Sequence, residues 1–276
     1  VVFLKSFKQI PEVENLILKE KPESFEAYDD KTLKLAIKFM PSLIRAIGFR
    51  NAVKMFFQLL PDFWLILTGG FPELVFLAEF TDDNETKIVQ TVSPLLQKIR
   101  SLGIKARLTP NEDVDKGYWT IRRESFNLLR QHVKGKHTAP FIDDVIVRPE
   151  QLAEFLPRLN TIVTKYPEFI YTIAGHAGDA NFHVIPLVDF KDPKFIKDIR
   201  RISEEVYDLV AKFKGSITAE HNDGLIRTPY LHKMYSKEML KLFEMTKEIF
   251  DPKNIFNPGK KVRGNLEYAL SKIKKE

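Results

Sequence analysis

Two histidines stand seven residues apart in the segment AGHAGDANFH, residues 174–183. Its glycines and other small residues let a backbone turn sharply, so the segment predicts a β-hairpin that brings His176 and His183 together. Two imidazoles need a third ligand to hold a divalent metal ion, and a carboxylate is the usual one. Glu220, in ITAEHNDGLIR, is the candidate for that position. The alternative is an ordinary turn that contains two histidines, because short motifs have a high false-positive rate.

The chain contains no cysteine. Disulfides, thiolate zinc sites, iron–sulfur ligation and a cysteine nucleophile are therefore excluded for these 276 residues. A ligand set of His176, His183 and Glu220 suits Zn²⁺, Mn²⁺ or Fe²⁺, and the ligand types alone do not choose among the three ions.

His221 follows Glu220 directly and begins a polar stretch that reads His-Asn-Asp-Gly. Such a stretch favours an irregular loop, in which neighbouring side chains can reach one cavity. An imidazole beside a metal ion is suited to proton transfer near neutral pH. We therefore predict His221 as the catalytic base, with a purely structural hydrogen bond as the alternative.

A pair of arginines that includes Arg122 lies in YWTIRRESF, within a predicted helix whose apolar stripe contains Trp119 and Phe126. At least one of the two must face inward or sideways, and an inward arginine needs an anion. That anion is either a substrate carboxylate or a protein carboxylate such as Asp115 or Glu124.

The elements that must position these residues alternate along the chain. Strand-like segments rich in β-branched and aromatic residues lie at 1–7, 24–29, 73–80, 143–148, 168–174 and 182–188. Predicted helices lie at 10–20, 31–47, 50–60, 85–102, 112–131, 150–164, 193–214 and 237–250. Pro94 predicts a kink or a restart in the helix at 85–102.

The helix at 193–214 has clear ends, with Asp192 as cap, Pro193 in the first turn and Gly215 closing it in a left-handed conformation. The helix at 237–250 has Ser236 as its cap. Its inward residues are predicted to be Met239, Leu242, Phe243, Ile249 and Phe250.

The order of elements predicts an α+β fold, in which a ferredoxin-like, mostly antiparallel sheet carries helices on one face and is followed by a C-terminal helical segment. A doubly wound nucleotide fold is less favoured, because the chain has neither G-x-G-x-x-G after a strand nor a P-loop. The segment FDPKNIFNPGK, residues 250–260, is dense in turn formers and ends a helix.

The formal charge of +6 includes a basic run from Lys260 to Lys275. It suits an anionic substrate or simply a solvated basic face, and no motif supports nucleic-acid binding. Residues 56–67 are the most apolar stretch and are too short to cross a bilayer. No signal peptide is visible, and the strand-like start at Val1 indicates a fragment. We expect a cytoplasmic protein, with peripheral contact at the inner face of the membrane as a further option.

Three segments in this order carry a family resemblance: GHAGDANFH, TAEHNDGLIRTPYL and FDPKNIFNPGKKV. Together they resemble the C-terminal substrate domain of FAD-linked oxidases of the vanillyl-alcohol-oxidase type. That group includes D-lactate dehydrogenases, glycolate oxidase subunits and D-2-hydroxyglutarate dehydrogenases. The resemblance covers almost the whole chain, is closest over residues 117–262, and is nearest to large members that fuse this flavin half to an iron–sulfur half.

The resemblance implies a substrate and flavin-capping domain over residues 1–265, with two β-α-β halves split near residue 135 as one arrangement, and a basic tail at 266–276. The domain that binds most of the FAD would precede it and is absent from this chain. An iron–sulfur electron acceptor is a further implied partner.

Carried over residue by residue, the resemblance implies His176, His183 and Glu220 as ligands of Zn²⁺ or Mn²⁺, Glu220 and Asn257 on the cofactor side, His221 as base, and Arg122 as the clamp on the substrate carboxylate. The implied reaction oxidises the α-hydroxyl of a 2-hydroxy acid to a 2-oxo acid by hydride transfer to FAD.

Departures from the family pattern leave the substrate open. Ala180 and Asn222 each replace a common glycine, and Phe126 replaces a hydroxyl residue of the hydroxyglutarate enzymes. Their substrate lysine has no equivalent at 141–144, where Arg148 is the nearest cation and the candidate for a substrate contact. Two rivals from other classes are a non-redox module that binds metal and an organic acid, and a metal-dependent hydrolase with the same His-His-Glu set.

Overall fold

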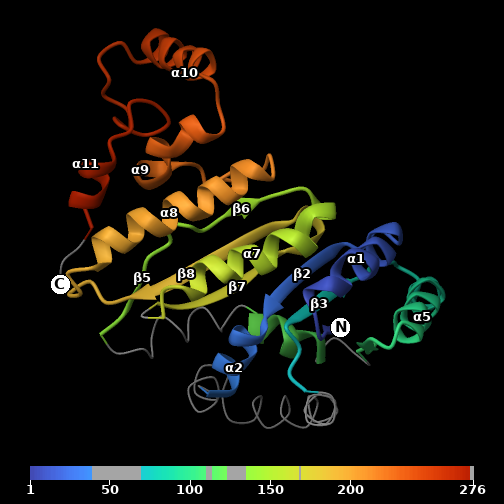
Figure 1. Ribbon diagram of the computed structural model, residues 1–276. Helices are drawn as coiled ribbons and strands as arrows, with labels where there is room; N and C mark the ends of the chain where they lie inside the picture. The colour runs from blue at the N-terminus through green and yellow to red at the C-terminus, as the bar shows by residue number, and fades with distance from the viewer. Residues whose placement is uncertain (39–69, 110–113, 123–134, 168, 274–276) are drawn as a thin grey trace.

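The computed structural model describes residues 1–38, 70–109, 114–122, 135–167 and 169–273. Its centre is one open sheet in which every recorded pairing is antiparallel, with the strand order β4-β1-β3-β2-β7-β8-β5 and with β6 beside β8 (Figure 1). The strands are β1 (Val2–Leu4), β2 (Ser24–Asp29), β3 (Leu74–Glu79), β4 (Lys105–Ala106), β5 (His137–Thr138), β6 (Val145–Ile146), β7 (Ile170–His176) and β8 (Asn181–Val188). The predicted antiparallel α+β fold is confirmed.

The same strand order occurs twice in the sheet. The first part of the chain has the order β4-β1-β3-β2. In the second part, Ser216 bridges Ile146 of β6, β6 pairs with β8, and β8 pairs with β7. The order is the same, because β6, β7, β8 and Ser216 take the places of β1, β2, β3 and β4. The two parts meet where β2 pairs with β7, so the junction lies in the middle of the sheet.

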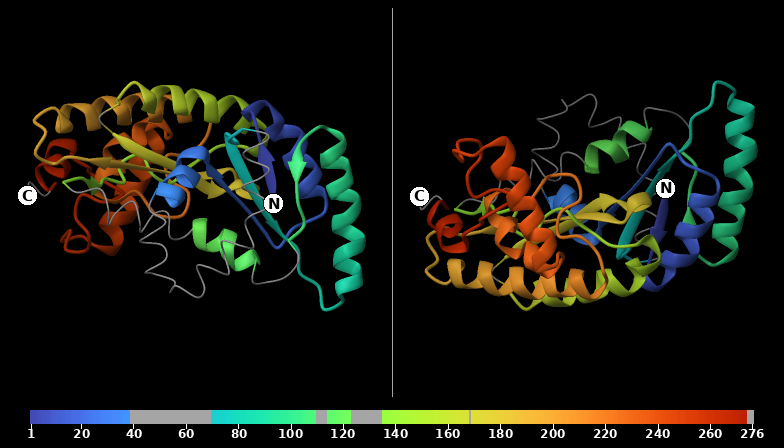
Figure 2. Two further views of the ribbon diagram at one scale, coloured as in Figure 1. Left: turned by 90° about the horizontal axis from the view of Figure 1, so that it is seen from below. Right: turned by 90° about the horizontal axis from the view of Figure 1, so that it is seen from above.

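Helices α1 (Ile10–Lys19), α5 (Glu85–Ser101), α7 (Leu152–Thr164) and α8 (Phe195–Lys212) pack on one face of the sheet. Seen edge-on, α7 and α8 lie along that face and the helical residues 114–122 lie on the other (Figure 2). Residues of α2 (Asp30–Lys38) and of 114–122 form a smaller cluster with Phe3, Tyr28 and Val75. The second face of the sheet is therefore partly covered, over the β1–β3–β2 region.

Several predicted details of the helices are corrected by the structure. α5 contains Pro94 without a break. α8 begins after Lys194, although the Asp192 carboxylate still accepts from the Lys194 N–H at 2.9 Å. The left-handed residue after α8 is Lys214, at φ 54°, and not Gly215. Glycine is required at 215 for another reason, because a Cβ there would lie 2.3 Å from the carbonyl oxygen of Ile146.

The C-terminal part differs more strongly from expectation. It contains α9 (Gly224–Arg227), α10 (Lys237–Phe250) and the unpredicted α11 (Leu266–Ser271). The Ser236 side chain caps α10 as predicted. The prediction that α10 faces inward is wrong, because none of its residues is buried, and Ile249 and Phe250 are 74% and 80% exposed. The apolar periodicity is present, but among the predicted inward residues only Phe243 is half-buried, where its ring packs against Tyr235.

The predicted helix at 50–60, the apolar stretch 56–67 and Phe126 lie outside the described residues. So do most residues of the predicted helices at 31–47 and 112–131. Within the described part of the chain, no helix is long and apolar enough to cross a membrane.

Candidate metal centre

The hairpin of β7 and β8 forms as predicted and carries two of the candidate ligands. His176 pairs with Asn181 and Ala174 pairs with His183, so the two histidines are diagonal neighbours. Directly paired residues of an antiparallel ladder point to the same face. Both imidazoles therefore project away from α7 and α8. The turn needs Gly175, where a Cβ would lie 2.1 Å from the Asn181 carbonyl oxygen.

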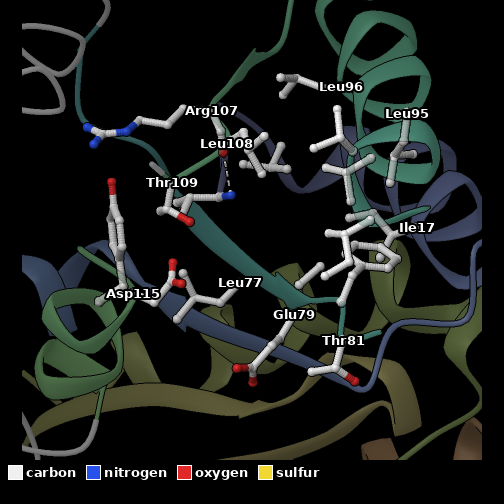
Figure 3. Close-up of a pocket in the computed structure, with 18 of the residues that line it drawn as sticks. Ile17, Leu77, Glu79, Thr81, Leu95, Leu96, Arg107, Leu108, Thr109 and Asp115 are labelled. Carbon is white, nitrogen blue, oxygen red and sulfur yellow. Dashed lines mark hydrogen bonds between the residues drawn. The ribbon is translucent and has the colours of Figure 1, made fainter. Parts of the chain in front are cut away.

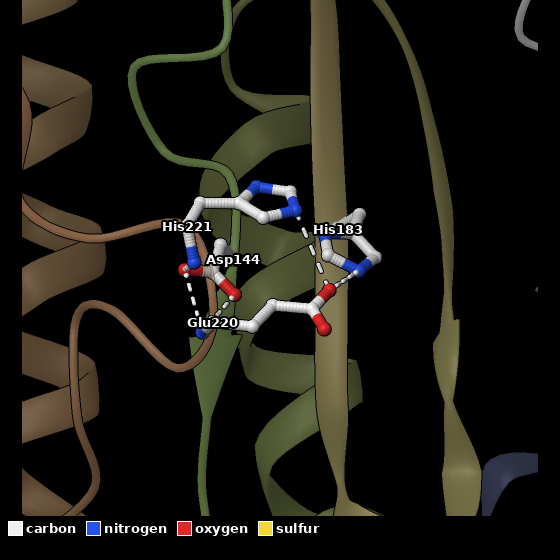
Figure 4. Close-up of side chains that lie close together, drawn as sticks. All are labelled: Asp144, His183, Glu220 and His221. Atoms are coloured by element: carbon white, nitrogen blue, oxygen red, sulfur yellow. Dashed lines mark hydrogen bonds and ion pairs between the residues drawn. The ribbon is translucent and has the colours of Figure 1, made fainter.

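Three imidazoles meet at one carboxylate oxygen. Oε1 of Glu220 lies 3.4 Å from Nε2 of His176, 3.2 Å from Nε2 of His183 and 3.4 Å from Nε2 of His221. Figure 4 shows His183 and His221 turned toward Glu220 from the hairpin and from the loop. The His183 and His221 rings stack with centroids 5.0 Å apart. The structure thus brings together the three predicted metal ligands and the predicted base.

The opposite nitrogen of each ring faces a second carboxylate. Nδ1 of His176 lies 2.6 Å from Oε1 of Glu26. Asp143 serves the other two rings, with its Oδ1 3.0 Å from His183 Nδ1 and its Oδ2 3.3 Å from His221 Nδ1. An Nδ1–H that donates to a carboxylate leaves Nε2 with its lone pair. All three Nε2 atoms are therefore oriented as metal ligands or proton acceptors.

Asp144 builds the loop that carries Glu220 and His221. The carboxylate is fully buried, and its residue has a φ of 64°. It accepts hydrogen bonds from the backbone N–H groups of Ala219, Glu220 and His221, the Thr218 hydroxyl and the Asn181 amide. Burial opposes its ionised form, yet these donors hold the pKa of Asp144 below its ordinary value of 3.8. Asp144 lies within the cluster, but its oxygens are committed to the loop, so we do not assign it as a ligand.

A buried arginine fixes the far side of this loop. Nη1 of Arg227 donates to the carbonyl oxygen of Asp143 at 2.6 Å, and Nη2 donates to that of Asn222 at 2.7 Å. The same guanidinium lies 3.6 Å from the Asp144 carboxylate. Its charge offsets part of the negative charge that Asp143 and Asp144 bring to the site.

The electrostatic balance of the cluster favours a cation. Burial alone would lower the pKa of His183, but the hydrogen bond and charge of Asp143, with the charges of Glu220 and Asp144, raise it above 6.5. The surroundings therefore stabilise positive charge at this point. A proton on the imidazole or a bound divalent ion supplies it, and the histidine and carboxylate donors fit Zn²⁺ or Mn²⁺.

The remaining predicted site residues have different surroundings. Arg122, in the helical residues 114–122, forms an ion pair with Glu26 at 2.6 Å, and Glu26 also contacts His176. Arg122 is thus connected to the cluster through Glu26, and Glu124, one of the two carboxylates expected as its partner, lies outside the described residues. Arg148 is exposed in the turn before α7, and Asn257 is exposed after α10 with φ 47°. The structure does not join either side chain to the cluster.

Sequence reasoning missed Glu26, Asp143 and Asp144. Each is charged and buried, and Glu26 and Asp143 each follow a large apolar residue in the strand-like segments SFEAYD and FIDDVIVR. A charged residue at a buried strand position needs a partner, and that was the available signal. The partners lie far away in the sequence, 150 residues for Glu26 and His176.

A separate cavity of about 780 Å³ lies between α5 and the β1–β3 side of the sheet (Figure 3). Its lining includes the apolar side chains of Ile17, Leu77 and Leu95 and the polar side chains of Glu79 and Asp115. None of its lining residues belongs to the histidine cluster. The candidate site is therefore defined by the imidazoles that converge on Glu220 and not by this cavity.

The fold and the cluster define a domain that gathers three histidines and a glutamate on one face of an antiparallel sheet. The chain belongs to the family described as FAD linked oxidases, C-terminal domain, whose model matches residues 1–261. This finding confirms the resemblance read from the three sequence segments.

Among similar curated proteins, D-2-hydroxyglutarate dehydrogenase of Pseudomonas putida is 30% identical over 253 residues, which cover 89% of this chain and 23% of that protein. D-lactate dehydrogenase of Archaeoglobus fulgidus is 28% identical over 84% of this chain and 46% of its own length. Glycolate oxidase subunit GlcD of Bacillus subtilis is 33% identical over 43% of this chain and 25% of its own length. The chain thus spans less than half the length of these relatives.

Among solved structures, 4-ethylphenol oxidase from Gulosibacter chungangensis superposes with a TM-score of 0.56 at 13% identity, covering 97% of this chain and 54% of that chain. An alkyldihydroxyacetonephosphate synthase superposes with a TM-score of 0.52 at 10% identity, covering 93% and 43%. These likenesses support the fold alone.

Proposed function

We propose that this chain is the substrate-binding, flavin-capping part of a metal-assisted, FAD-dependent 2-hydroxyacid dehydrogenase. The observation that carries the proposal is the approach of three imidazole Nε2 atoms to one oxygen of Glu220, with each Nδ1 facing a carboxylate. Family membership supplies the flavin, and the relatives named as acting on D-2-hydroxyglutarate, D-lactate or glycolate suggest the substrate class.

In this proposal His176, His183 and Glu220 hold a divalent ion, either Zn²⁺ or Mn²⁺. When bound, the ion polarises the α-hydroxyl and lowers its pKa. Nε2 of His221 accepts the hydroxyl proton, and Asp143 at its Nδ1 stabilises the imidazolium that forms. When bound, FAD would supply the acceptor for the hydride that leaves the α-carbon.

Arg122 binds the substrate carboxylate in this scheme, because a guanidinium can pair with it through two parallel hydrogen bonds. Its position beside Glu26, which contacts the metal ligand His176, supports the role. Arg148 remains a candidate for a second polar group of the substrate, and Asn257 remains a candidate for a flavin contact. Both side chains are exposed and so are accessible to a ligand or to another domain.

The FAD-binding domain is the proposed partner of the exposed apolar face formed by Leu242, Ile249, Phe250, Ile255 and Phe256. These side chains are between 53% and 80% exposed, and large exposed apolar side chains grouped in one segment, here residues 242–256, favour an interaction site. The relatives contain much more chain than the matched part, which provides room for such a domain. We also propose an iron–sulfur electron acceptor, on the resemblance to large fused members, and a cytoplasmic location with peripheral membrane contact.

Metal content of the purified protein tests the site directly. After exposure to Zn²⁺ or Mn²⁺ and removal of excess ion, the wild type is expected to retain metal, and His176→Ala and Glu220→Ala are expected to lose it. His232→Ala is the matched control, because His232 is exposed and bonds only to the Pro229 carbonyl oxygen in the described contacts. Equal metal content in the wild type and the two site variants contradicts the proposal.

Flavin reduction tests the chemistry. Protein that contains its FAD-binding domain is mixed anaerobically with D-lactate, glycolate or D-2-hydroxyglutarate, and bleaching of the flavin absorbance is followed. His221→Ala is expected to slow the bleaching by about 10²–10⁴-fold through loss of the base. Metal-dependent ester hydrolysis without flavin would favour the hydrolase, and metal and acid binding without bleaching would favour the non-redox module.

A further inference from the structure

Glu26 is a buried carboxylate in the middle of the sheet. It belongs to β2, which lies between β3 and β7, and the residue is 7% exposed. Its direct partner across the β2–β7 ladder is His176, so both side chains project from the same face. A carboxylate in this position is costly unless charged or hydrogen-bonding groups compensate it.

The two oxygens of Glu26 contact two different parts of the site. Oε1 lies 2.6 Å from Nδ1 of His176, and Oε2 lies 2.6 Å from a guanidinium nitrogen of Arg122. The side chains of Glu26 and Arg122 are 10% and 20% exposed. Both contacts are therefore shielded from water, where charge-assisted contacts are stronger than at the surface.

We propose that Glu26 is a positioning residue that fixes the metal ligand His176 and the substrate-binding Arg122 through one carboxylate. This inference rests on the proposed function, and it adds a link between metal binding and substrate binding. The contact with Nδ1 orients the imidazole so that Nε2 faces Glu220. The contact with Arg122 holds the Arg122 guanidinium beside β2.

Asp143 provides the contrast that makes the inference testable. It also bridges two groups, but its partners are His183 and His221, the second metal ligand and the proposed base. Removing either carboxylate should weaken metal binding. Only Glu26 should affect the step that depends on Arg122, and only Asp143 should affect the step that depends on His221.

The first experiment measures metal affinity of the purified protein with Zn²⁺, by competition with a chelator. Glu26→Gln keeps the shape of the side chain and one acceptor oxygen but removes the charge. Its Zn²⁺ affinity is expected to fall about 10–100-fold, as is typical when a group that orients a ligand is changed. The visible absorption of the Co²⁺-substituted protein should change as well, because it reports the geometry of the ligands.

Glu154→Gln is the matched control for loss of a carboxylate. Glu154 also pairs with an arginine, Arg158, but its side chain is 62% exposed on α7, which packs on the face of the sheet opposite to the histidines. Its Zn²⁺ affinity and Co²⁺ spectrum are expected to match those of the wild type. If Glu26→Gln behaves like this control, the inference is overturned.

The second experiment measures steady-state kinetics at saturating metal, in protein that contains its FAD-binding domain. Glu26→Gln is expected to raise KM for the 2-hydroxy acid about tenfold with little change in kcat, because Arg122 loses its ion pair with Glu26. Asp143→Asn is expected to lower kcat instead. An unchanged KM in Glu26→Gln overturns the link to Arg122.

Two further outcomes keep the inference separate from the proposed function. Wild-type protein that binds Zn²⁺ but reduces no flavin with any 2-hydroxy acid overturns the proposed function, while the affinity comparison still decides whether Glu26 positions His176. If Glu26→Gln fails to fold, Glu26→Asp replaces it. The shorter carboxylate cannot reach both partners at 2.6 Å, so retention of full affinity and KM would overturn the inference.

Discussion

Asp144→Asn is the substitution that most directly tests how the loop carrying Glu220 and His221 is held. Oδ2 of Asp144 accepts from the N–H groups of Ala219 and His221, both at 2.9 Å. Asparagine keeps one acceptor oxygen and replaces the other by an NH₂ group. At least two backbone N–H groups then lose a charged acceptor. The new NH₂ group is itself a donor, and it faces a donor of the loop.

The expected loss of stability follows from these contacts. A hydrogen bond to a charged group contributes about 1.5–3 kcal/mol, so two of them amount to about 3–6 kcal/mol. The lower end applies because the side chains of Glu220 and His221 are each 47% exposed, and the loop can open toward water. We therefore expect the free energy of unfolding to fall by about 3 kcal/mol, a large part of the 5–15 kcal/mol typical of a domain.

Urea unfolding followed by far-ultraviolet circular dichroism measures this change. Glu154→Gln is the control, because Glu154 and its partner Arg158 are 62% and 45% exposed, and exposed pairs contribute little. The folded pKa of Asp144 lies below 3.8, so its contribution is present above pH 3.8 and is lost as the pH falls through the folded value. The difference between wild type and variant should therefore narrow below pH 3.8. A variant within 0.5 kcal/mol of the wild type at pH 7 would refute this account of the loop, since that is about the range of neutral surface changes.

Three other predictions test the hairpin, a buried acid and the exposed helix. Gly175→Ala should lower the free energy of unfolding by at least about 1–3 kcal/mol, because its Cβ would lie 2.1 Å from the Asn181 carbonyl oxygen; Gly178→Ala, with its nearest contact at 3.5 Å, should be much milder, and equal urea midpoints would argue against the hairpin geometry. Burial and the charge of a nearby glutamate raise the pKa of Glu14 to about 8, so its contribution to stability is present below pH 4.5 and is lost as the pH rises through 8. Glu14→Gln should remove that decline, and an identical pH profile of thermal unfolding would exclude a protonated Glu14. Phe250→Ser should leave the unfolding free energy within about 0.5 kcal/mol, because the ring is 80% exposed; in pull-down assays it should weaken binding of the FAD-binding domain, and undiminished binding would argue against that interface.

The local chemistry of the chain was sufficient to predict much of the fold. The strand at 24–29 has the predicted bounds, and α1, α5, α7 and α10 lie within about two residues of theirs. Short-range properties of the sequence predict these elements: alternation or periodicity of apolar residues, capping side chains and turn formers. The hairpin of His176 and His183 was predictable for the same reason, because small residues and glycines between two apolar segments restrict the connection.

The candidate ligands were readable only because three separate segments carry a combined pattern. Each segment alone is an ordinary turn or helix end. The tertiary structure then decided which nitrogen of each histidine faces the centre, because Glu26 and Asp143 reach the rings from β2 and from the segment before β6. Those contacts join residues 40 to 150 positions apart, and no local pattern specifies such a pairing.

The apolar stripe on α10 is a second example of the difference between what the sequence determines locally and what the tertiary structure decides. The sequence by itself determined that residues 237–250 form an amphipathic helix with Ser236 as its cap, because both properties depend on residues within one or two turns. Whether that stripe is covered depends on which other element lies against it, and the described elements leave Met239, Leu242, Ile249 and Phe250 exposed. Helix formation is thus encoded locally, whereas the partner of a helix face and the partner of a buried charge are decided by the packing of distant segments.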